Sequence, residues 1–457
     1  MLWNFIKWLF GFYRRRKIHG DAKFMGRFSR KSLLNKRNSG LVVDGIHRLP
    51  QDRSYSHLAI VAPTGAGKTT RYVLPNVLNM KEASFVVTDP SGEILEKSER
   101  YLRRQGYNVL TLNFTDIPSS DRYNPLSRCE THSDSRKMAE MLIDAAYQNS
   151  HGNDLFWNDS AKGILNLLIR AIKRFAPHQQ NLGELYRILN QFGHGQDEVN
   201  RIMAENLDQS SFDEFKAFLS QDDKVMNSIL STAKTALASF SDPGLSLLTR
   251  EDTVAFERLR TEKTALFVIV PEHEVRYYNF MLTVLYTQIF NFCMQLPVNG
   301  MPYHPVFFFL DEFGNAGKLP NFSTMITTLR KRKVSVSIVL QDVEQLVNVY
   351  GQADASVILN GGCASRIFYP GLSYKTCEEL SRMLGTQTVA YQESGFSRTD
   401  DFLPDRDREL GVPLMRPEEI MTMPNDRAIF THANLRPVLL KTHPWFRIRK
   451  LKQRVNR

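Results

Sequence analysis

Segment 62–69 constrains the fold of this chain more than any other. It reads A-P-T-G-A-G-K-T, follows the apolar run 58–61 and leads into residues that favour a helix. A strand, a glycine-bearing loop and a helix in this order are typical of a phosphate-binding loop, in which backbone N–H groups and a helix N-terminus surround an anion. Ala62 stands where glycine is usual, and alanine is small enough to be tolerated.

Each residue type in this loop has a role in nucleotide chemistry. Lys68 can reach the β- and γ-phosphates, and the Thr69 hydroxyl can ligate Mg²⁺. The residues that we expect to contact ATP are Thr64, Gly65, Ala66, Gly67, Lys68, Thr69 and Thr70. The alternative is a strand–turn–helix junction that needs its glycines only for the turn, so a second motif is needed to decide.

That second motif lies far downstream. Residues 306–310 are V-F-F-F-L and are followed directly by Asp311 and Glu312. A fully apolar run predicts a strand buried on both faces of a parallel sheet, and open α/β sheets bind ligands at the carboxyl ends of their strands. We predict that Asp311 holds Mg²⁺ through water and that Glu312 is the base that polarises the attacking water. The alternative is that both acids only solvate the strand end, but with Lys68 upstream the pair indicates ATP hydrolysis.

Composition bounds the class of protein. A chain of 457 residues with 42% apolar and 23% charged residues is typical of a globular protein of two domains, or of one domain with a large insertion. Its four cysteines are far apart in sequence and form no C-x-x-C pair (Cys129, Cys293, Cys363 and Cys377). This spacing implies neither a disulfide framework nor a zinc site and fits a reducing cytoplasm. The eleven histidines form no ligand cluster either, so Mg²⁺ carried with the nucleotide is the only metal that we expect.

The charge is concentrated at the two ends. Residues 1–38 carry a net charge of +10 and residues 441–457 carry +7, so the body between them is mildly acidic at −6. Strongly basic ends usually contact nucleic acid or an anionic membrane surface. The alternative for residues 441–457 is a solvated tail.

Residues 1–13 are apolar and rich in tryptophan, and a basic cluster follows at 14–17. A helix of this length is too short to cross a bilayer, and its charges follow the apolar run, unlike those of a secretory signal. We therefore expect an interfacial anchor on the cytoplasmic leaflet. The segment could equally dock on a membrane-spanning partner or be the stump of a longer membrane segment.

Short apolar runs at 84–89, 107–112, 265–270 and 334–340 alternate with helical patterns, which predicts an α/β fold. Between 121 and 261 the strand signal disappears and helix-spaced apolar residues dominate, with many acids among them. The acidic face of this region either docks a protein substrate or only keeps the helices soluble. The expected domains are a basic tail (1–40), a nucleotide-binding domain in two parts (41–120 and 262–440), an inserted all-α domain (121–261) and a second basic tail (441–457).

Two further polar residues are candidates for catalysis. Gln341 follows the apolar run 334–340, beside the Asp311 strand, and we expect it to sense the γ-phosphate unless it merely caps a loop. Arg330 opens the basic run 330–333 and is our candidate for an arginine finger that reaches a neighbouring subunit's ATP, with Arg366 as the second candidate. The alternative is that the run 330–333 complements the C-terminal dipole of a helix.

Taken together, the motifs resemble those of the type IV secretion coupling proteins, the TraG/TraD-type ATPases of conjugation. The segments that carry the resemblance are H-G-D-A-K-F (19–24), the phosphate loop (62–69), T-D-P-S-G-E (88–93), Y-N-P-L (123–126), L-D-E-F (310–313) and the ending L-G (384–385). Gln341 also follows Asp311 at the family's usual interval, and Arg330 falls where family members carry an arginine finger.

The resemblance implies a RecA-like P-loop ATPase domain with a central, mostly parallel sheet, an inserted all-α domain, ATP and Mg²⁺ as cofactors, and a ring of six subunits. Such proteins bring a relaxase bound to single-stranded DNA, or protein effectors, to a type IV secretion channel at the cytoplasmic face of the bacterial inner membrane. Family members usually carry two membrane-spanning helices at the N-terminus. This chain has residues 1–13 in that place, so a separate membrane subunit is an alternative to a lipid anchor.

Two other functions fit the same motor motifs. One is a double-stranded DNA translocase of the FtsK/HerA type. The other is a nucleotide-gated platform that docks effectors without translocating them, against which the intact set of Lys68, Asp311 and Glu312 argues.

Overall fold

The computed structural model describes residues 19–148, 154–193, 196–295, 302–315, 317–393 and 406–456. The predicted anchor at 1–13 lies outside these residues and stays a prediction. Within the described ranges, no helix combines the length and the apolar character that crossing a membrane requires.

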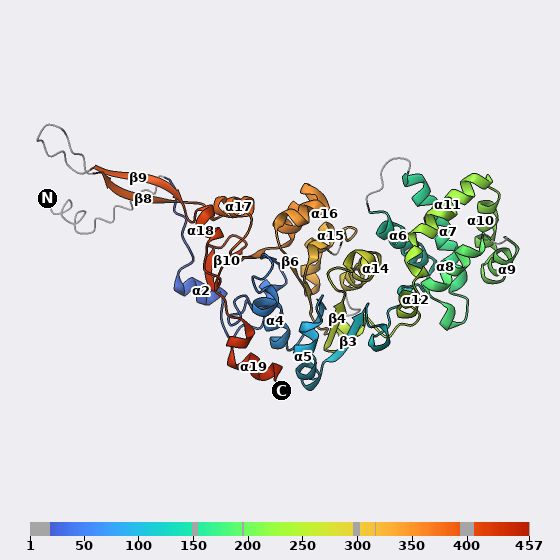
Figure 1. Cartoon of the computed structure of the whole chain (residues 1–457), viewed down its shortest axis with the longest axis horizontal. Coiled ribbons are helices and arrows are strands. Elements are labelled where there is room, and N and C mark those ends of the chain that lie inside the picture. The colour runs from blue at the N-terminus through green and yellow to red at the C-terminus, as the bar shows by residue number, and fades with distance from the viewer. Residues whose placement is uncertain are drawn as a thin grey trace, which may run out of the picture.

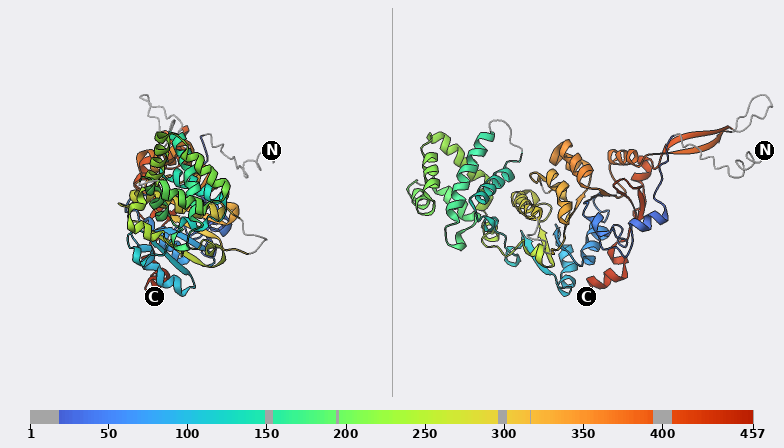
Figure 2. Two further views of the ribbon diagram at one scale, coloured as in Figure 1. Left: turned by 90° about the vertical axis from the view of Figure 1, so that its right-hand side faces the viewer. Right: turned by 180° about the vertical axis from the view of Figure 1, so that it is seen from behind.

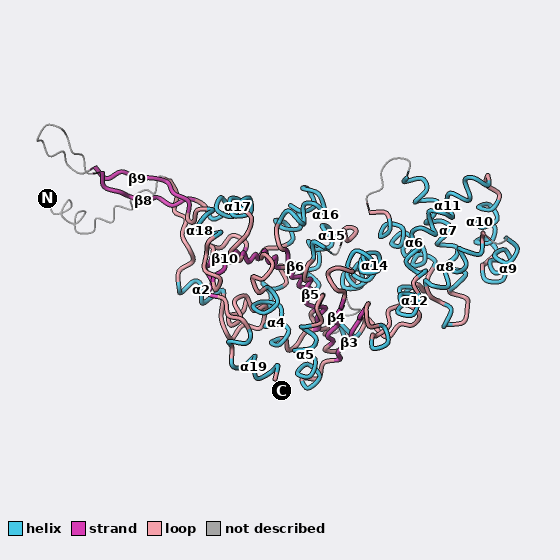
Figure 3. Tube along the Cα trace, in the orientation of Figure 1, coloured by secondary structure: helices cyan, strands magenta, loops and turns pink. Residues whose placement is uncertain are grey.

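A sheet forms the centre of the molecule (Figure 3). It has nine strands in the order β11-β10-β7-β1-β6-β5-β2-β4-β3. All neighbours from β7 to β3 are parallel, whereas β10 runs antiparallel to both β7 and β11. The strands are β1 (Leu58–Val61), β2 (Ser84–Thr88), β3 (Asn108–Asn113), β4 (Thr264–Ile269), β5 (Val306–Leu310), β6 (Val334–Leu340), β7 (Ser365–Phe368), β10 (Arg427–His432) and β11 (Val438–Lys441). The α/β prediction with a mostly parallel sheet is confirmed.

Helices cover both faces of this sheet (Figures 1 and 2). Because side chains alternate along a strand, Ile60 joins the core on one face and Ala59 the core on the other. On the Ile60 face lie α4 (Leu74–Asn79), α5 (Glu93–Arg104) and α19 (Arg449–Val455), and on the Ala59 face lie α14 (Val275–Met294), α15 (Phe322–Leu329) and α16 (Val343–Ser356). The strands between these layers are almost wholly buried, which explains why they are apolar on both faces.

A helical domain replaces the connection between β3 and β4, which are neighbours in the sheet. Its helices are α6 (His132–Ala146), α7 (Asp154–Ile172), α8 (Leu182–Gln191), α9 (Gln196–Asn206), α10 (Gln209–Leu219), α11 (Asp223–Ala236) and α12 (Pro243–Leu248). A capping box between Thr131 and Asp134 starts α6, because each side chain binds the other's backbone N–H. The helix α14 packs against α6, so one apolar core runs from the sheet into this domain.

At the end opposite the helical domain, an antiparallel hairpin of β8 (Thr386–Glu393) and β9 (Arg406–Pro413) projects from the body (Figure 1). The backbone of Gly20 and Ala22 hydrogen-bonds to β8, so the start of the described chain lies against the hairpin. The other α-helices among the described residues are α2 (Arg27–Leu33), α3 (Gln51–Ser54), α13 (Arg258–Thr261), α17 (Tyr374–Leu384) and α18 (Pro417–Met421).

The basic C-terminal region is folded and does not extend as a tail. Lys441 ends β11, and α19 packs against α4 and α5 with Leu451 buried. The apolar residues Ile448, Leu451 and Val455 recur at helical spacing among the cations and pack against the same core. Residues 441–456 therefore belong to the folded body, and the alternative of a solvated tail does not hold for them.

Candidate nucleotide site

The phosphate-binding loop connects β1 to a helical turn, Thr69–Val73, that continues into α4. Gly65 and Gly67 have φ values of 78° and 81°, a left-handed conformation that disfavours residues with a Cβ atom. The Ala62 N–H donates to the Leu340 carbonyl (2.9 Å) and so ties the start of the loop to β6. The loop therefore takes its shape from its glycines and its position from the sheet.

The loop forms one wall of a cavity of about 460 Å³. The residues lining this cavity are Thr64, Gly65, Gly67, Lys68, Thr69, Thr70, Pro90, Ser91, Glu93, Glu272, Asp311 and Glu312. All the predicted loop residues except Ala66 are among them. The cavity lies at the carboxyl ends of the parallel strands, where α/β sheets bind ligands.

The two motifs predicted from sequence meet in this cavity. Lys68 Nζ lies 2.6 Å from Glu312 Oε1, and both side chains are buried. The Thr69 hydroxyl donates to Asp311 Oδ2 at 3.3 Å. The strand β6 lies between β1 and β5, so these contacts join side chains from two strands across a third.

Gln341 directly follows the last residue of β6, the middle strand. Gln341 Nε2 donates to Glu312 Oε2 at 2.9 Å, so Lys68 and Gln341 each hold one oxygen of the same carboxylate. Glu312 has a φ of 53°, a left-handed conformation that is strained for a residue other than glycine. The surrounding hydrogen bonds keep this carboxylate in a fixed orientation despite the strain.

Burial changes the acidity of the carboxylates near the loop. It raises the pKa of Asp311, while the nearby Lys68 charge acts in the opposite direction. A hydroxyl and a carboxylate, from Thr69 and Asp311, are oxygen ligands of the kind that Mg²⁺ prefers, and Mg²⁺ commonly completes its shell with water and substrate phosphates. The donor set therefore fits the predicted magnesium site.

Asp89, at the end of β2, was not predicted as a site residue. Burial, with a smaller contribution from the charge of Asp311, raises its pKa to about 6. Its Oδ2 accepts the Leu95 N–H (2.8 Å), while its buried Oδ1 has no hydrogen-bond partner within the described chain. Asp89 thereby fixes the loop that carries Ser91 and Glu93 into the cavity.

The motif 88–93 at a strand end was the signal that could have identified Pro90, Ser91 and Glu93 as lining residues. Glu272 lies in the loop after β4 and belongs to no motif. Only its place beyond the carboxyl end of a parallel strand could have indicated it.

The structure does not bring Arg330 to the cavity of its own chain. Arg330 begins the turn between α15 and β6, at the amino end of the parallel strands and so on the opposite edge of the sheet from Lys68. Burial, with a smaller contribution from the charge of Arg330, lowers the pKa of His57, just before β1, to about 4. Arg366, in β7, donates to the Leu359 carbonyl (2.8 Å) and lines a different cavity.

A family model described as "Type IV secretory system Conjugative DNA transfer" matches residues 22–457. The chain belongs to this family. The resemblance to the coupling proteins of type IV secretion is therefore confirmed.

Two relatives illustrate the sequence distances within the coupling-protein family. Protein VirD4 of Agrobacterium fabrum (strain C58 / ATCC 33970) is 25% identical over 412 residues, which are 87% of this chain and 58% of the relative. The conjugal transfer protein TraG of Escherichia coli is 22% identical over 423 residues, or 84% of this chain and 64% of the relative. This chain thus spans less than two thirds of the length of either relative.

Solved structures of the coupling protein TrwB share the fold. The unbound monoclinic form of TrwBdeltaN70 has a TM-score of 0.71 at 17% identity and covers 93% of this chain and 96% of its own. TrwB in complex with ADP and Mg²⁺ has a TM-score of 0.70 at 18% identity, with the same coverage. The coupling-protein fold predicted from the motifs is confirmed.

Proposed function

We propose that this chain is the ATP-hydrolysing motor of a type IV secretion coupling protein that drives single-stranded DNA, with its bound relaxase, or protein effectors towards a secretion channel. The observation that carries the proposal is the contact of Lys68 and Gln341 with the two oxygens of Glu312. This arrangement supports Lys68 as the phosphate-binding cation, Glu312 as the base and Gln341 as the polar sensor. The family membership supplies the class of cargo.

The contacts indicate how the residues act in hydrolysis. The triphosphate of ATP enters loop 64–70, and Lys68 exchanges Glu312 for the β- and γ-phosphate oxygens. Glu312, still oriented by Gln341, then accepts a proton from the attacking water. Thr69 and Asp311 would hold Mg²⁺, which neutralises charge on the phosphates when bound.

Arg330 acts as an arginine finger only between subunits. Since it lies on the opposite edge of the sheet from its own cavity, it can stabilise the transferring phosphoryl group only in the cavity of a neighbouring chain. This geometry supports a ring, for which we propose six subunits. Residues 1–13 then attach the ring to the cytoplasmic face of the inner membrane, through lipid or a membrane subunit.

The decisive experiment compares nucleic acids as activators of the full chain. We expect single-stranded DNA to increase the rate of ATP hydrolysis more than duplex DNA of equal length does. The Glu312→Gln variant, which keeps the fold, should show no stimulation with either. Streptavidin displacement from biotinylated duplex would instead indicate a double-strand translocase, and ATP turnover that ignores both nucleic acids would contradict DNA transport.

A further inference from the structure

The two basic ends of the sequence meet in a second cavity, of about 330 Å³, which we call the basic hollow. Six cations line it: Lys36, Arg37, Arg48, Lys81, Lys450 and Arg454. Glu82 is the one acid among the lining residues, and within the described parts of the chain none of the six cations forms a salt bridge with a carboxylate. The hollow thus gathers six cations against one carboxylate.

Two of these cations are held in place by one asparagine. Arg48 donates to the Asn79 carbonyl at 3.3 Å, and Arg454 donates to Asn79 Oδ1 at 2.8 Å and to the Leu78 carbonyl at 2.6 Å. Burial lowers the pKa of Arg48, and the charge of Arg454 lowers it further. Like charges so close together destabilise the folded chain unless an anion joins them.

The exposed cations of the hollow are also positioned by backbone contacts. Asn35 and Arg48 exchange two backbone hydrogen bonds, of 3.0 and 3.1 Å, and Asn35 Oδ1 accepts the Arg37 N–H. These bonds keep the tip formed by Lys36 and Arg37 beside Arg48. The helix α19 brings Lys450 to the same hollow.

The hollow is separate from the nucleotide cavity. Phe307, near the start of β5, lines the hollow, whereas Asp311, just after the end of β5, lines the nucleotide cavity. Four residues of strand place these sites about 13 Å apart along the sheet. An anion in the hollow is therefore not the phosphate that Lys68 binds.

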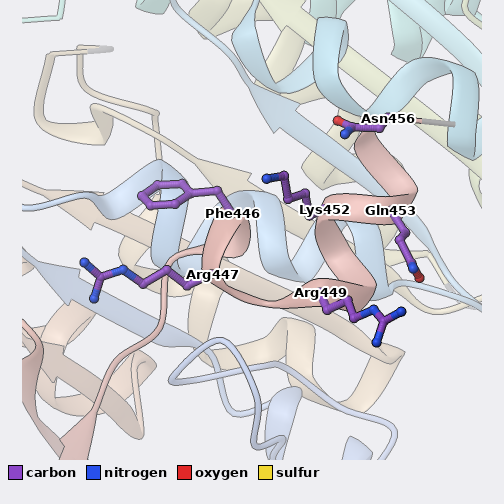
Figure 4. Close-up of a pocket in the computed structure, with 6 residues that line it drawn as sticks. All are labelled: Phe446, Arg447, Arg449, Lys452, Gln453 and Asn456. Carbon is purple, nitrogen blue, oxygen red and sulfur yellow. The ribbon is translucent and has the colours of Figure 1, made fainter.

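A third hollow, of about 500 Å³, adjoins α19 and includes an aromatic ring (Figure 4). Phe446 is 49% exposed there and projects beside Lys452 and Arg447. The helix α19 contributes residues to both the basic hollow and this third hollow. Fixed guanidinium groups bind phosphates through paired hydrogen bonds, and an exposed aromatic ring is a surface on which unpaired bases stack.

We propose that the basic hollow binds the phosphates of a single nucleic-acid strand, with a base stacked on Phe446. The choice of nucleic acid as the partner rests on the proposed function, but the position of the contact does not. A concave site with fixed arginines favours a strand over the flat surface of a bilayer, which is the competing partner.

The test uses the full chain and a fluorescein-labelled thymidine oligonucleotide, with anisotropy measured over a range of salt concentrations. The variant Lys36→Gln/Arg37→Gln/Lys450→Gln should lower the magnitude of the slope of log K against log salt by about 2, because each lost phosphate contact removes about 0.7 from a single-strand slope. The matched control Arg136→Gln/Arg201→Gln/Lys216→Gln removes the same charge from exposed sites in the helical domain and should leave the slope unchanged. Phe446→Ala should weaken binding at least about fivefold without changing the slope.

Three results would overturn the proposal. One is equal slopes in the hollow variant and the wild type; if the wild type still hydrolyses ATP faster with DNA, the proposed function survives. The second is an equal decrease of the salt slope in the hollow variant and in the control. The third is loss of binding to phosphatidylglycerol vesicles alone, with oligonucleotide binding intact, which would assign the hollow to lipid.

Discussion

Lys68 Nζ and Glu312 Oε1 lie 2.6 Å apart although 244 positions separate them in the chain. The contact joins the phosphate-binding loop to the end of β5 within one buried cluster. In the proposed mechanism Lys68 exchanges this carboxylate for a phosphate, and Glu312 is placed to respond directly to that exchange.

Replacing Glu312 by glutamine should separate binding from turnover. The amide keeps the size of the side chain but cannot accept a proton, so we expect ATP affinity within about threefold of wild type and a loss of turnover of about a hundredfold or more. Fluorescent ATP-analogue binding and phosphate release measure the two quantities. Glu99→Gln, an exposed change on α5, should alter neither, and substantial turnover in Glu312→Gln would remove Glu312 from the mechanism.

Arg330→Ala should abolish ATP turnover by itself. Mixing it with a second inactive variant should restore part of that turnover. Mixed with Lys68→Ala chains, it can place an intact Arg330 beside an intact loop at some interfaces, so partial activity should return at intermediate mixing ratios. Lys331→Ala, at the neighbouring exposed position, should remain active alone. If no mixture recovers turnover, the finger does not act between subunits.

Asp89 should give folding stability a specific pH dependence. Its pKa is about 6 in the folded chain, above the ordinary value of about 3.9 for the unfolded chain. Between these values the folded state binds more protons, so its contribution to stability falls as pH rises, by up to about 3 kcal/mol in total.

Urea unfolding of Asp89→Asn against wild type at pH 4 and pH 7 measures this contribution. We expect the free energy of unfolding of the variant to increase relative to that of the wild type between pH 4 and pH 7. Asp213→Asn, at an exposed position on α10, should show no such gain. A difference that is constant with pH would show that Asp89 titrates normally.

Leu451→Ala should destabilise the whole chain, because α19 belongs to the core beneath the sheet. Emptying the space of a buried leucine costs about 2–5 kcal/mol. Lys452→Ala, the adjacent exposed change on the same helix, should cost less than about 0.5 kcal/mol. Equal small effects in thermal unfolding would mean that α19 is not part of the cooperative unit.

Much of the nucleotide site was predictable because parallel strands gather their carboxyl ends at one edge. That rule and the loop motif place Lys68, Asp311 and Gln341 together from the sequence alone. Glu272 escaped prediction because a lone acid in a loop carries no pattern. The position of Arg330 at the amino ends of the strands follows from its place just before the run 334–340.

The hairpin of β8 and β9 and the helix α19 were also missed. Strands 386–393 and 406–413 contain few apolar residues and project from the body, so neither shows the alternation that a half-buried strand produces. In α19 the dense positive charge obscured a short apolar stripe. Both cases show that composition predicts poorly where an element buries only a few side chains.

The helical domain occupies the place of a single crossover beside β3, the outermost strand of the sheet. A domain inserted at the edge of a sheet can grow, shrink or be replaced during evolution without changing the hydrogen bonds between the central strands. Family members that transport different substrates can thus diversify in this helical domain while they keep the same ATPase core.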